Sequence, residues 1–230
     1  MALTARVFAD RAAAGAALAG EMQQRPLRAP VLVLALPRGG VPVAYEVARV
    51  LDAPLDVMLV RKVGMPGQPE LAIGAVASGD IVVRDPTIEQ EVPGIAEAFD
   101  RIAAGERREL LRREQVYRAG LEPLALEGKT VVLVDDGLAT GSTMLAAVRA
   151  ARAGRAATIV VAAPVASPQA VDLLAPEADA IVILQIPALL FAIGEWYERF
   201  EQLEDDEVCR LLEQHRRSRP ESGAPDQAAR

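Results

Sequence analysis

Short continuous apolar runs alternate with longer amphipathic stretches along much of this 230-residue chain. Apolar runs of this length are typical of strands covered on both faces, whereas helical periodicity predicts amphipathic helices. The predicted strands cover residues 31–36, 55–60, 131–134, 158–165 and 180–186. The predicted helices cover residues 5–24, 42–51, 144–154, 168–174 and 204–217. This alternation predicts an α/β fold, a parallel sheet with helices on both faces.

The middle of the chain departs from this alternation. Residues 63–70 are rich in glycine and proline and are predicted to form a loop. A hairpin is predicted from residues 71–77 and 81–84, with its turn at residues 78–80. Residues 93–119 carry mixed charges at helical spacing, which indicates a surface helix; a lid or a dimer arm is the alternative. Hairpin and helix together are expected to form a small hood beside the sheet.

The composition fits one globular domain, predicted over residues 1–217, with a polar tail at residues 218–230 that is expected to be disordered. The net charge is −7, so a basic face for nucleic acid is not expected. No apolar run reaches the length of a membrane span. Residues 12–20 are small and mostly apolar, but Asp10 and Arg11 precede them, which favours an amphipathic helix over a signal peptide. We therefore expect a cytoplasmic protein without nucleic-acid or membrane partners.

The single cysteine and the single histidine offer little chemistry. Cys209 has no partner for an intramolecular disulfide and is expected to be a small buried side chain. His215 lies beside arginines near the polar tail, so it is predicted to be a surface residue rather than a catalytic group.

Two adjacent carboxylates follow the apolar run at residues 131–134. Asp135 and Asp136 come first, and a loop of small and hydroxyl residues at 137–143 then leads into a helix. Ligands of open parallel sheets bind at the carboxyl ends of strands, and a loop that opens a helix there presents N–H groups to an anion. Carboxylates suit ribose hydroxyls or Mg²⁺. No lysine follows the second glycine, which excludes a Walker P-loop.

A second strand, glycine loop and helix occupy residues 31–51. The loop reads Pro37-Arg38-Gly39-Gly40. The two glycines allow unusual backbone angles, and the arginine adds one cation; a plain turn is the alternative. Arg61 and Lys62 follow the next predicted strand, where two cations are costly unless they are exposed or face an anion.

The thirteen residues at 131–143 closely resemble the motif with which type I phosphoribosyltransferases bind 5-phosphoribosyl-1-pyrophosphate (PRPP). The resemblance implies that Asp135 and Asp136 hold the ribose hydroxyls of PRPP. The residues implied to form the site for ribose and 5-phosphate are Asp135, Asp136, Gly137, Ala139, Thr140, Gly141, Ser142 and Thr143. The residues implied to bind pyrophosphate are Arg38, Gly39, Gly40, Arg61 and Lys62. The candidate catalytic residues are Arg38, Asp135, Asp136 and, by loose analogy to a base, Glu70, for which a surface acid is the alternative.

The resemblance implies transfer of the 5-phosphoribosyl group from PRPP to a nitrogen acceptor, possibly a nucleobase, with release of pyrophosphate. Mg²⁺ is the implied cofactor, carried by PRPP near Asp135 and Asp136, and a homodimer is the expected assembly. A non-catalytic regulator that binds PRPP or a nucleotide is the alternative function. An interaction module that uses the charged helix at residues 93–119 is a third.

The acceptor stays open because the sequence departs from known subfamilies. Ala139 stands where 6-oxopurine enzymes carry an aspartate, and residues 164–168 lack the lysine that those enzymes carry. The lysine-rich mobile loop of orotate enzymes is also missing. The remaining candidate acceptors are adenine and an acceptor of an unrecognised kind. The aromatic residues that could stack on a base, or instead anchor the C-terminal segment to the core, are Phe191, Trp196, Tyr197 and Phe200.

Overall fold

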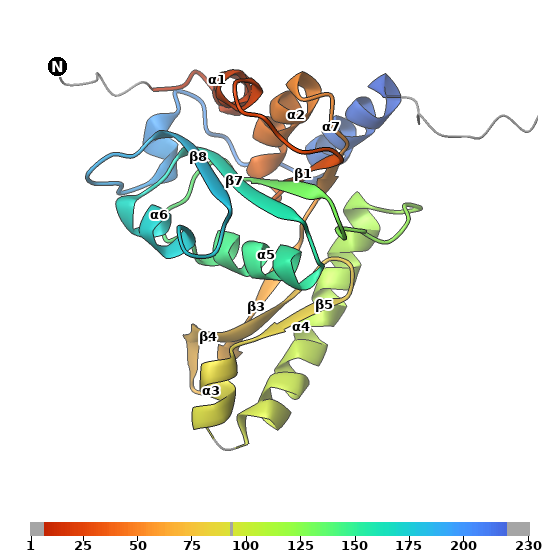
Figure 1. Cartoon of the computed structure of the whole chain (residues 1–230), viewed down its shortest axis with the longest axis vertical. Helices are drawn as coiled ribbons and strands as arrows, with labels where there is room; N and C mark the ends of the chain where they lie inside the picture. Colours follow the sequence, from red (N-terminus) through yellow and green to blue (C-terminus); the bar gives the residue numbers. More distant parts are fainter. Residues whose placement is uncertain (1–6, 93, 220–230) are drawn as a thin grey trace, which may run out of the picture.

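The computed structural model describes residues 7–92 and 94–219, without the side chains of residues 69, 70, 86 and 87. Its central sheet has five parallel strands in the order β2-β1-β6-β7-β8 (Figure 1). These strands are β1 (Val31–Ala35), β2 (Leu55–Val57), β6 (Thr130–Val134), β7 (Thr158–Val165) and β8 (Ala180–Gln185). The predicted parallel α/β fold is confirmed. Most of the predicted tail at residues 218–230 lies outside the described residues.

Helices cover both faces of this sheet (Figure 1). On one face lie α1 (Arg11–Gln23), α2 (Gly40–Val50) and α7 (Asp205–Ser218); on the other lie α5 (Ser142–Ala153) and α6 (Pro168–Leu174). Along β6, Val132 and Val134 pack toward α1 and α2, while Val131 and Leu133 pack toward α5. A strand covered on both faces favours apolar side chains at every position, which explains the apolar run at residues 131–134. Within the described ranges, no helix is long and apolar enough to cross a membrane.

In the hood, residues 60–92 and 94–117, the strands lie on the far side of α5 from the central sheet, and the long helix extends back to contact α7 (Figure 1). It consists of the antiparallel strands β3 (Val60–Met65), β4 (Gln68–Ala77) and β5 (Ile81–Arg84), and of the helices α3 (Pro86–Glu91) and α4 (Ile95–Tyr117). The predicted hairpin is confirmed, because β4 pairs with β5. Helix α4 buries one apolar face and exposes its charges, as expected of a surface helix.

Most of the loop predicted at residues 63–70 is β-strand, so that prediction was wrong. Strands β3 and β4 pair as far as Met65 and Gln68 and are joined by a tight turn. Gly67 lies in this turn with a φ of +80°, a conformation that glycine adopts without strain. Only Pro66 and Gly67 lie in the turn of the hairpin, whereas Gly64 and Pro69 lie within β3 and β4.

The strand predicted at residues 55–60 is divided between the two sheets. Strand β2 ends at Val57 in the central sheet, and β3 begins at Val60 in the hood. Arg61 and Lys62 therefore lie within a hood strand and not at the carboxyl end of a core strand.

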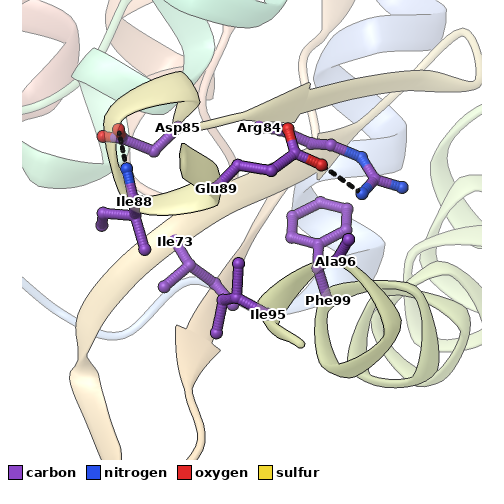
Figure 2. A pocket seen from close by; sticks show the side chains of 8 residues that line it. All are labelled: Ile73, Arg84, Asp85, Ile88, Glu89, Ile95, Ala96 and Phe99. Atoms are coloured by element: carbon purple, nitrogen blue, oxygen red, sulfur yellow. Dashed lines mark hydrogen bonds and ion pairs between the residues drawn. The ribbon is translucent and has the colours of Figure 1, made fainter. Parts of the chain in front are cut away.

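Figure 2 shows the apolar interior of the hood, which is continuous with the buried cluster between the central sheet and α2. Ile73 of β4, Ile88 of α3, and Ile95 and Phe99 of α4 point toward one another there. The guanidinium of Arg84 lies 4.5 Å from the centre of the Phe99 ring. The cavity between these side chains measures about 10 Å³, room for one water molecule at most. It is a packing gap and not a ligand site.

The surface position predicted for His215 is wrong. Its side chain is only 3% exposed, because α7 packs its inner face on α2 and β2. Ring atom Nε2 lies 3.0 Å from the carbonyl oxygen of Ala53, and the ring meets Tyr45 edge-on. Burial lowers the pKa of His215. Cys209 is half-buried, and its thiol donates to the carbonyl oxygen of Val116 at 3.3 Å.

Candidate functional site

Two loops meet at the carboxyl edge of the central sheet, where the neighbouring strands β1 and β6 end. The β1–α2 loop holds Arg38 and Gly39, Gly40 begins α2, and the β6–α5 loop begins with Asp135 and Asp136. A Cβ atom at Gly39 would lie 2.1 Å from Oδ2 of Asp136. Any other residue at this position would collide with the carboxylate, so glycine permits the direct contact of the two loops.

The two carboxylates stand close together and are partly buried. Oδ1 of Asp135 accepts a hydrogen bond from the backbone N–H of Asp136 at 2.9 Å. Burial, followed by the charge of Asp136, raises the pKa of Asp135 above its ordinary value of 3.8. A ligand that donates hydrogen bonds to this pair, such as a sugar diol, would offset part of the cost of ionising it.

Arg11, the first residue of α1, contacts the acid pair. Its Nε donates to Oδ2 of Asp136 at 2.7 Å, and the two side chains are only 12% and 14% exposed. In the sequence, Arg11 is only one of the charged residues that precede the small apolar stretch at residues 12–20. No local signal links it to a carboxylate 125 residues away, because only the folded chain brings α1 to this edge of the sheet.

The segment after β8 closes over the acid pair from the other side. It includes the short 3₁₀ helix η1 (Ile193–Trp196). A Cβ atom at Gly137 would lie 2.6 Å from the Ile193 side chain, and the hydroxyl of Tyr197 donates to the carbonyl oxygen of Asp136 at 2.6 Å. Tyr197 also stacks on Phe200, so these two aromatic residues anchor the segment. Phe191 does not, since it is 80% exposed.

The small-residue loop opens α5 as predicted, with the helix beginning at Ser142. Gly141 precedes it with a φ of +74°, and the exposed Thr140 hydroxyl lies 3.2 Å from that of Ser142. Ser167 supports the loop from behind, because its hydroxyl donates to the carbonyl oxygen of Ala139 at 2.6 Å. Backbone N–H groups and hydroxyls at the start of a long helix suit an anion such as phosphate. Thr143 is exposed in the first turn of α5.

The predicted cations are divided between the core and the hood. Arg38 follows a cis peptide bond after Pro37, and its guanidinium lies 3.8 Å from Asp205 and 3.9 Å from Glu204 at the start of α7. Its side chain therefore lies beside the acid pair's loop but faces carboxylates of the C-terminal segment.

In the hood, Arg61 pairs with Glu106 of α4 at 2.6 Å. Lys62 forms no hydrogen bond or ion pair with any described residue, and it lines a cleft of about 230 Å³ together with Ser142. Glu70 lies on β4, with its side chain outside the description. The fold thus brings Lys62 to the start of α5 and engages Arg61 elsewhere.

The donor set limits how Mg²⁺ could be held. Among the described residues, no group of three or more His, Cys, Asp or Glu side chains is arranged to bind a metal ion. Mg²⁺ is commonly held by one or two carboxylates together with oxygens of the substrate. Asp135 and Asp136 fit that mode, in which a bound substrate would supply the other oxygen ligands.

Comparison with known proteins identifies the family. Residues 9–207 match the sequence model of the phosphoribosyl transferase domain, so the chain belongs to this family. A protein of Mycobacterium tuberculosis, Rv0571c in strain H37Rv and MT0597 in strain CDC 1551, is provisionally named a phosphoribosyl transferase; it is 44% identical over 224 residues. The match covers 97% of this chain, which spans about half the length of these curated relatives.

A solved structure agrees with this assignment. The crystal structure of TT1426 from Thermus thermophilus superposes with a TM-score of 0.83 at 45% sequence identity. The superposition covers 90% of this chain and 97% of TT1426. The resemblance to phosphoribosyltransferases is thereby confirmed at the level of family and fold.

Proposed function

We propose that the chain binds PRPP at the carboxyl edge of the central sheet and transfers its phosphoribosyl group to a nitrogen acceptor, releasing pyrophosphate. The contact of Gly39 with Asp136 carries this proposal. This contact brings three features of the site together. They are the loop that carries Arg38, a carboxylate pair suited to a ribose diol, and a helix N-terminus suited to a phosphate. One ligand that carries pyrophosphate, ribose and 5-phosphate matches all three.

The reaction builds up charge that this site is suited to stabilise. As the bond between C1 and the pyrophosphate oxygen breaks, the ribose becomes positive and the leaving group becomes more negative. Arg38, with the N–H group of Gly39, would stabilise the leaving pyrophosphate, and such fixed donors favour the transition state. The N–H group of Gly40 already donates to the carbonyl oxygen of Leu36 at 3.0 Å. Asp135 and Asp136 would hold the ribose. Bound Mg²⁺ would neutralise further charge on the pyrophosphate.

The exposed apolar segment after β8 is a candidate acceptor surface. Phe191 and Leu189 are 80% and 71% exposed, and Ile193, two residues further on, contacts Gly137 beside the acid pair. An exposed aromatic ring at this place would stack on a planar base. This supports a heterocyclic acceptor without specifying which one.

One contact favours a second candidate, a regulator that binds PRPP without turnover. Glu204 and Asp205 lie within 4 Å of the Arg38 guanidinium and would compete with pyrophosphate for it. An arginine neutralised in this way would stabilise the leaving group less.

The test is a screen of the purified protein with PRPP, Mg²⁺ and a panel of nucleobases and other nitrogen nucleophiles, read as pyrophosphate release. Parallel calorimetry measures PRPP binding. Release with at least one acceptor supports the transferase. PRPP binding with no release for any acceptor supports the regulator, and absence of binding contradicts both.

A further inference from the structure

Arg11 is not among the residues proposed to bind PRPP, yet its side chain is held at the acid pair by several contacts. Besides donating to Oδ2 of Asp136, its guanidinium donates to the carbonyl oxygen of Glu201 at 2.9 Å. It also lies 3.8 Å from the centre of the Phe200 ring. Its orientation is therefore fixed by a carboxylate, a carbonyl group and an aromatic face.

The start of α1 fixes the backbone of Arg11 as well. Asp10 caps the helix, because its Oδ1 accepts from the N–H of Ala13 at 2.8 Å. Its other carboxylate oxygen accepts from Arg199, which belongs to the segment that carries Phe200 and Glu201. Helix α1 and the C-terminal segment thus hold Arg11 in place together.

Asp136 is held both at its carboxylate and at its backbone carbonyl group. Its Oδ2 lies between Arg11 and Gly39, in a space that only glycine leaves open. Its carbonyl oxygen accepts from the Tyr197 hydroxyl. With backbone and carboxylate both held, Asp136 would meet a ligand without rearranging, and a preorganised group of this kind raises affinity.

We propose that Arg11 is a positioning residue for PRPP, an inference that rests on the proposed PRPP binding. Arg11 holds the Asp136 carboxylate in the orientation that accepts the ribose hydroxyls. Its positive charge also balances the negative charge of the acid pair. Arginine suits this role because its planar guanidinium donates to two acceptors while stacking on a ring, which a lysine ammonium cannot do.

The experiment compares the binding of Mg²⁺–PRPP with that of Mg²⁺–pyrophosphate by calorimetry. Pyrophosphate has no ribose. If Arg11 acts through Asp136 on the ribose, its loss should weaken the binding of PRPP but not that of pyrophosphate. Arg11→Ala is expected to weaken PRPP binding by roughly tenfold or more, the loss typical of one hydrogen bond to a charged group. Pyrophosphate binding is expected to change less than about twofold, a loss too small for any hydrogen bond. Arg11→Lys is expected to lie between wild type and Arg11→Ala.

Arg25→Ala is the matched control, because Arg25 follows the same helix and, among the described residues, forms its ion pair with the partly exposed Glu21. It is expected to bind both ligands as the wild type does. If Arg11→Ala proves unfolded by circular dichroism, Arg11→Lys carries the test, with an expected loss of about threefold or more for PRPP alone. Where pyrophosphate binding is too weak to measure, the double variant Arg11→Ala with Asp136→Asn decides: it is expected to bind PRPP like Asp136→Asn alone.

Each contrary result has a distinct meaning. A wild-type protein that does not bind PRPP overturns the proposed function and this inference together. A wild type that binds PRPP, with unchanged or tighter binding by Arg11→Ala, overturns only the role of Arg11. Equal losses for PRPP and pyrophosphate, or a further loss in the double variant, reduce Arg11 to a structural residue.

Discussion

Strand β6 of the central sheet and strand β3 of the hood differ in what covers them. All five residues of β6 are buried, because helices lie on both faces of the sheet. In β3 only Val63 is buried, and charged residues occupy neighbouring positions. A continuous apolar run such as that of β6 is typical of a strand covered on both faces, so its own sequence predicts this environment. The environment of β3 depends instead on the strand and helix that pack against it.

The same difference divides the proposed site. The residues proposed to bind ribose and 5-phosphate, and the loop of Arg38, follow core strands, whereas the other candidates Arg61, Lys62 and Glu70 lie in the hood. We therefore expect core substitutions to affect stability and PRPP chemistry strongly, and hood substitutions to act weakly.

The largest expected contrast is between two leucines. Leu133 of β6 is fully buried, whereas Leu111 of α4 is 54% exposed. Leu133→Ala is expected to lower the free energy of unfolding by about 2–5 kcal/mol, the usual cost of such a cavity. Leu111→Ala is expected to change it by less than about 0.5 kcal/mol. Urea denaturation measures both, and equal losses would show that the core and hood do not differ as described.

Arg38→Ala tests the core loop that is proposed to bind the leaving group. Turnover is expected to fall by roughly 10²-fold, as for the loss of one oxyanion donor. PRPP affinity should fall less, because the interaction strengthens as the bond breaks. Steady-state kinetics with an identified acceptor separates the two effects. A change in KM alone would mean that Arg38 contributes only uniform binding.

Asp135→Asn is expected to stabilise the protein at neutral pH while weakening PRPP binding. The raised pKa means that the folded protein binds this proton more tightly than the unfolded chain, so ionising Asp135 costs stability. The melting temperature should rise by about 2–4 °C for each kcal/mol recovered. The gain over wild type should shrink as the pH falls through the raised pKa and vanish below the unfolded pKa. Calorimetric scans between neutral and acidic pH check the sign; a variant less stable at neutral pH contradicts it.

The smallest expected effect separates the two hood cations. Lys62→Ala is expected to weaken PRPP binding by up to about fivefold, the range for an exposed charge. Arg61→Ala should weaken it less, because Glu106 already engages the guanidinium. Calorimetric titrations of the two variants rank them, and a larger loss for Arg61→Ala would reverse the assignment.

The sequence alone predicts the core because its signals are local. The strands β1 and β6 contain the continuous apolar runs at residues 31–35 and 131–134, and both loops that follow them open helices as expected. Ser167 caps α6 as its hydroxyl and the following proline predict, with Ala170 as the N–H donor at 3.0 Å.

The missed features depend on residues that are distant in sequence. The contact of Arg11 with Asp136, the burial of His215 against Ala53, and the pairing of β3 with β4 arise only in the folded chain. Glycine and proline at residues 64–69 suggest a loop because the local pattern cannot show which strand will pair with its neighbour.

The most direct test of the central claim is the effect of Mg²⁺–PRPP on thermal unfolding of the wild type and of the variant Asp135→Asn with Asp136→Asn. A ligand specific to the folded state adds about 2.7 kcal/mol of stability at one hundred times its Kd. The account predicts a clear rise in melting temperature for the wild type at millimolar PRPP, and little or none for the double variant, which should itself remain folded. Equal shifts in both proteins, or no shift in the wild type, would contradict the assignment of the acid pair to PRPP.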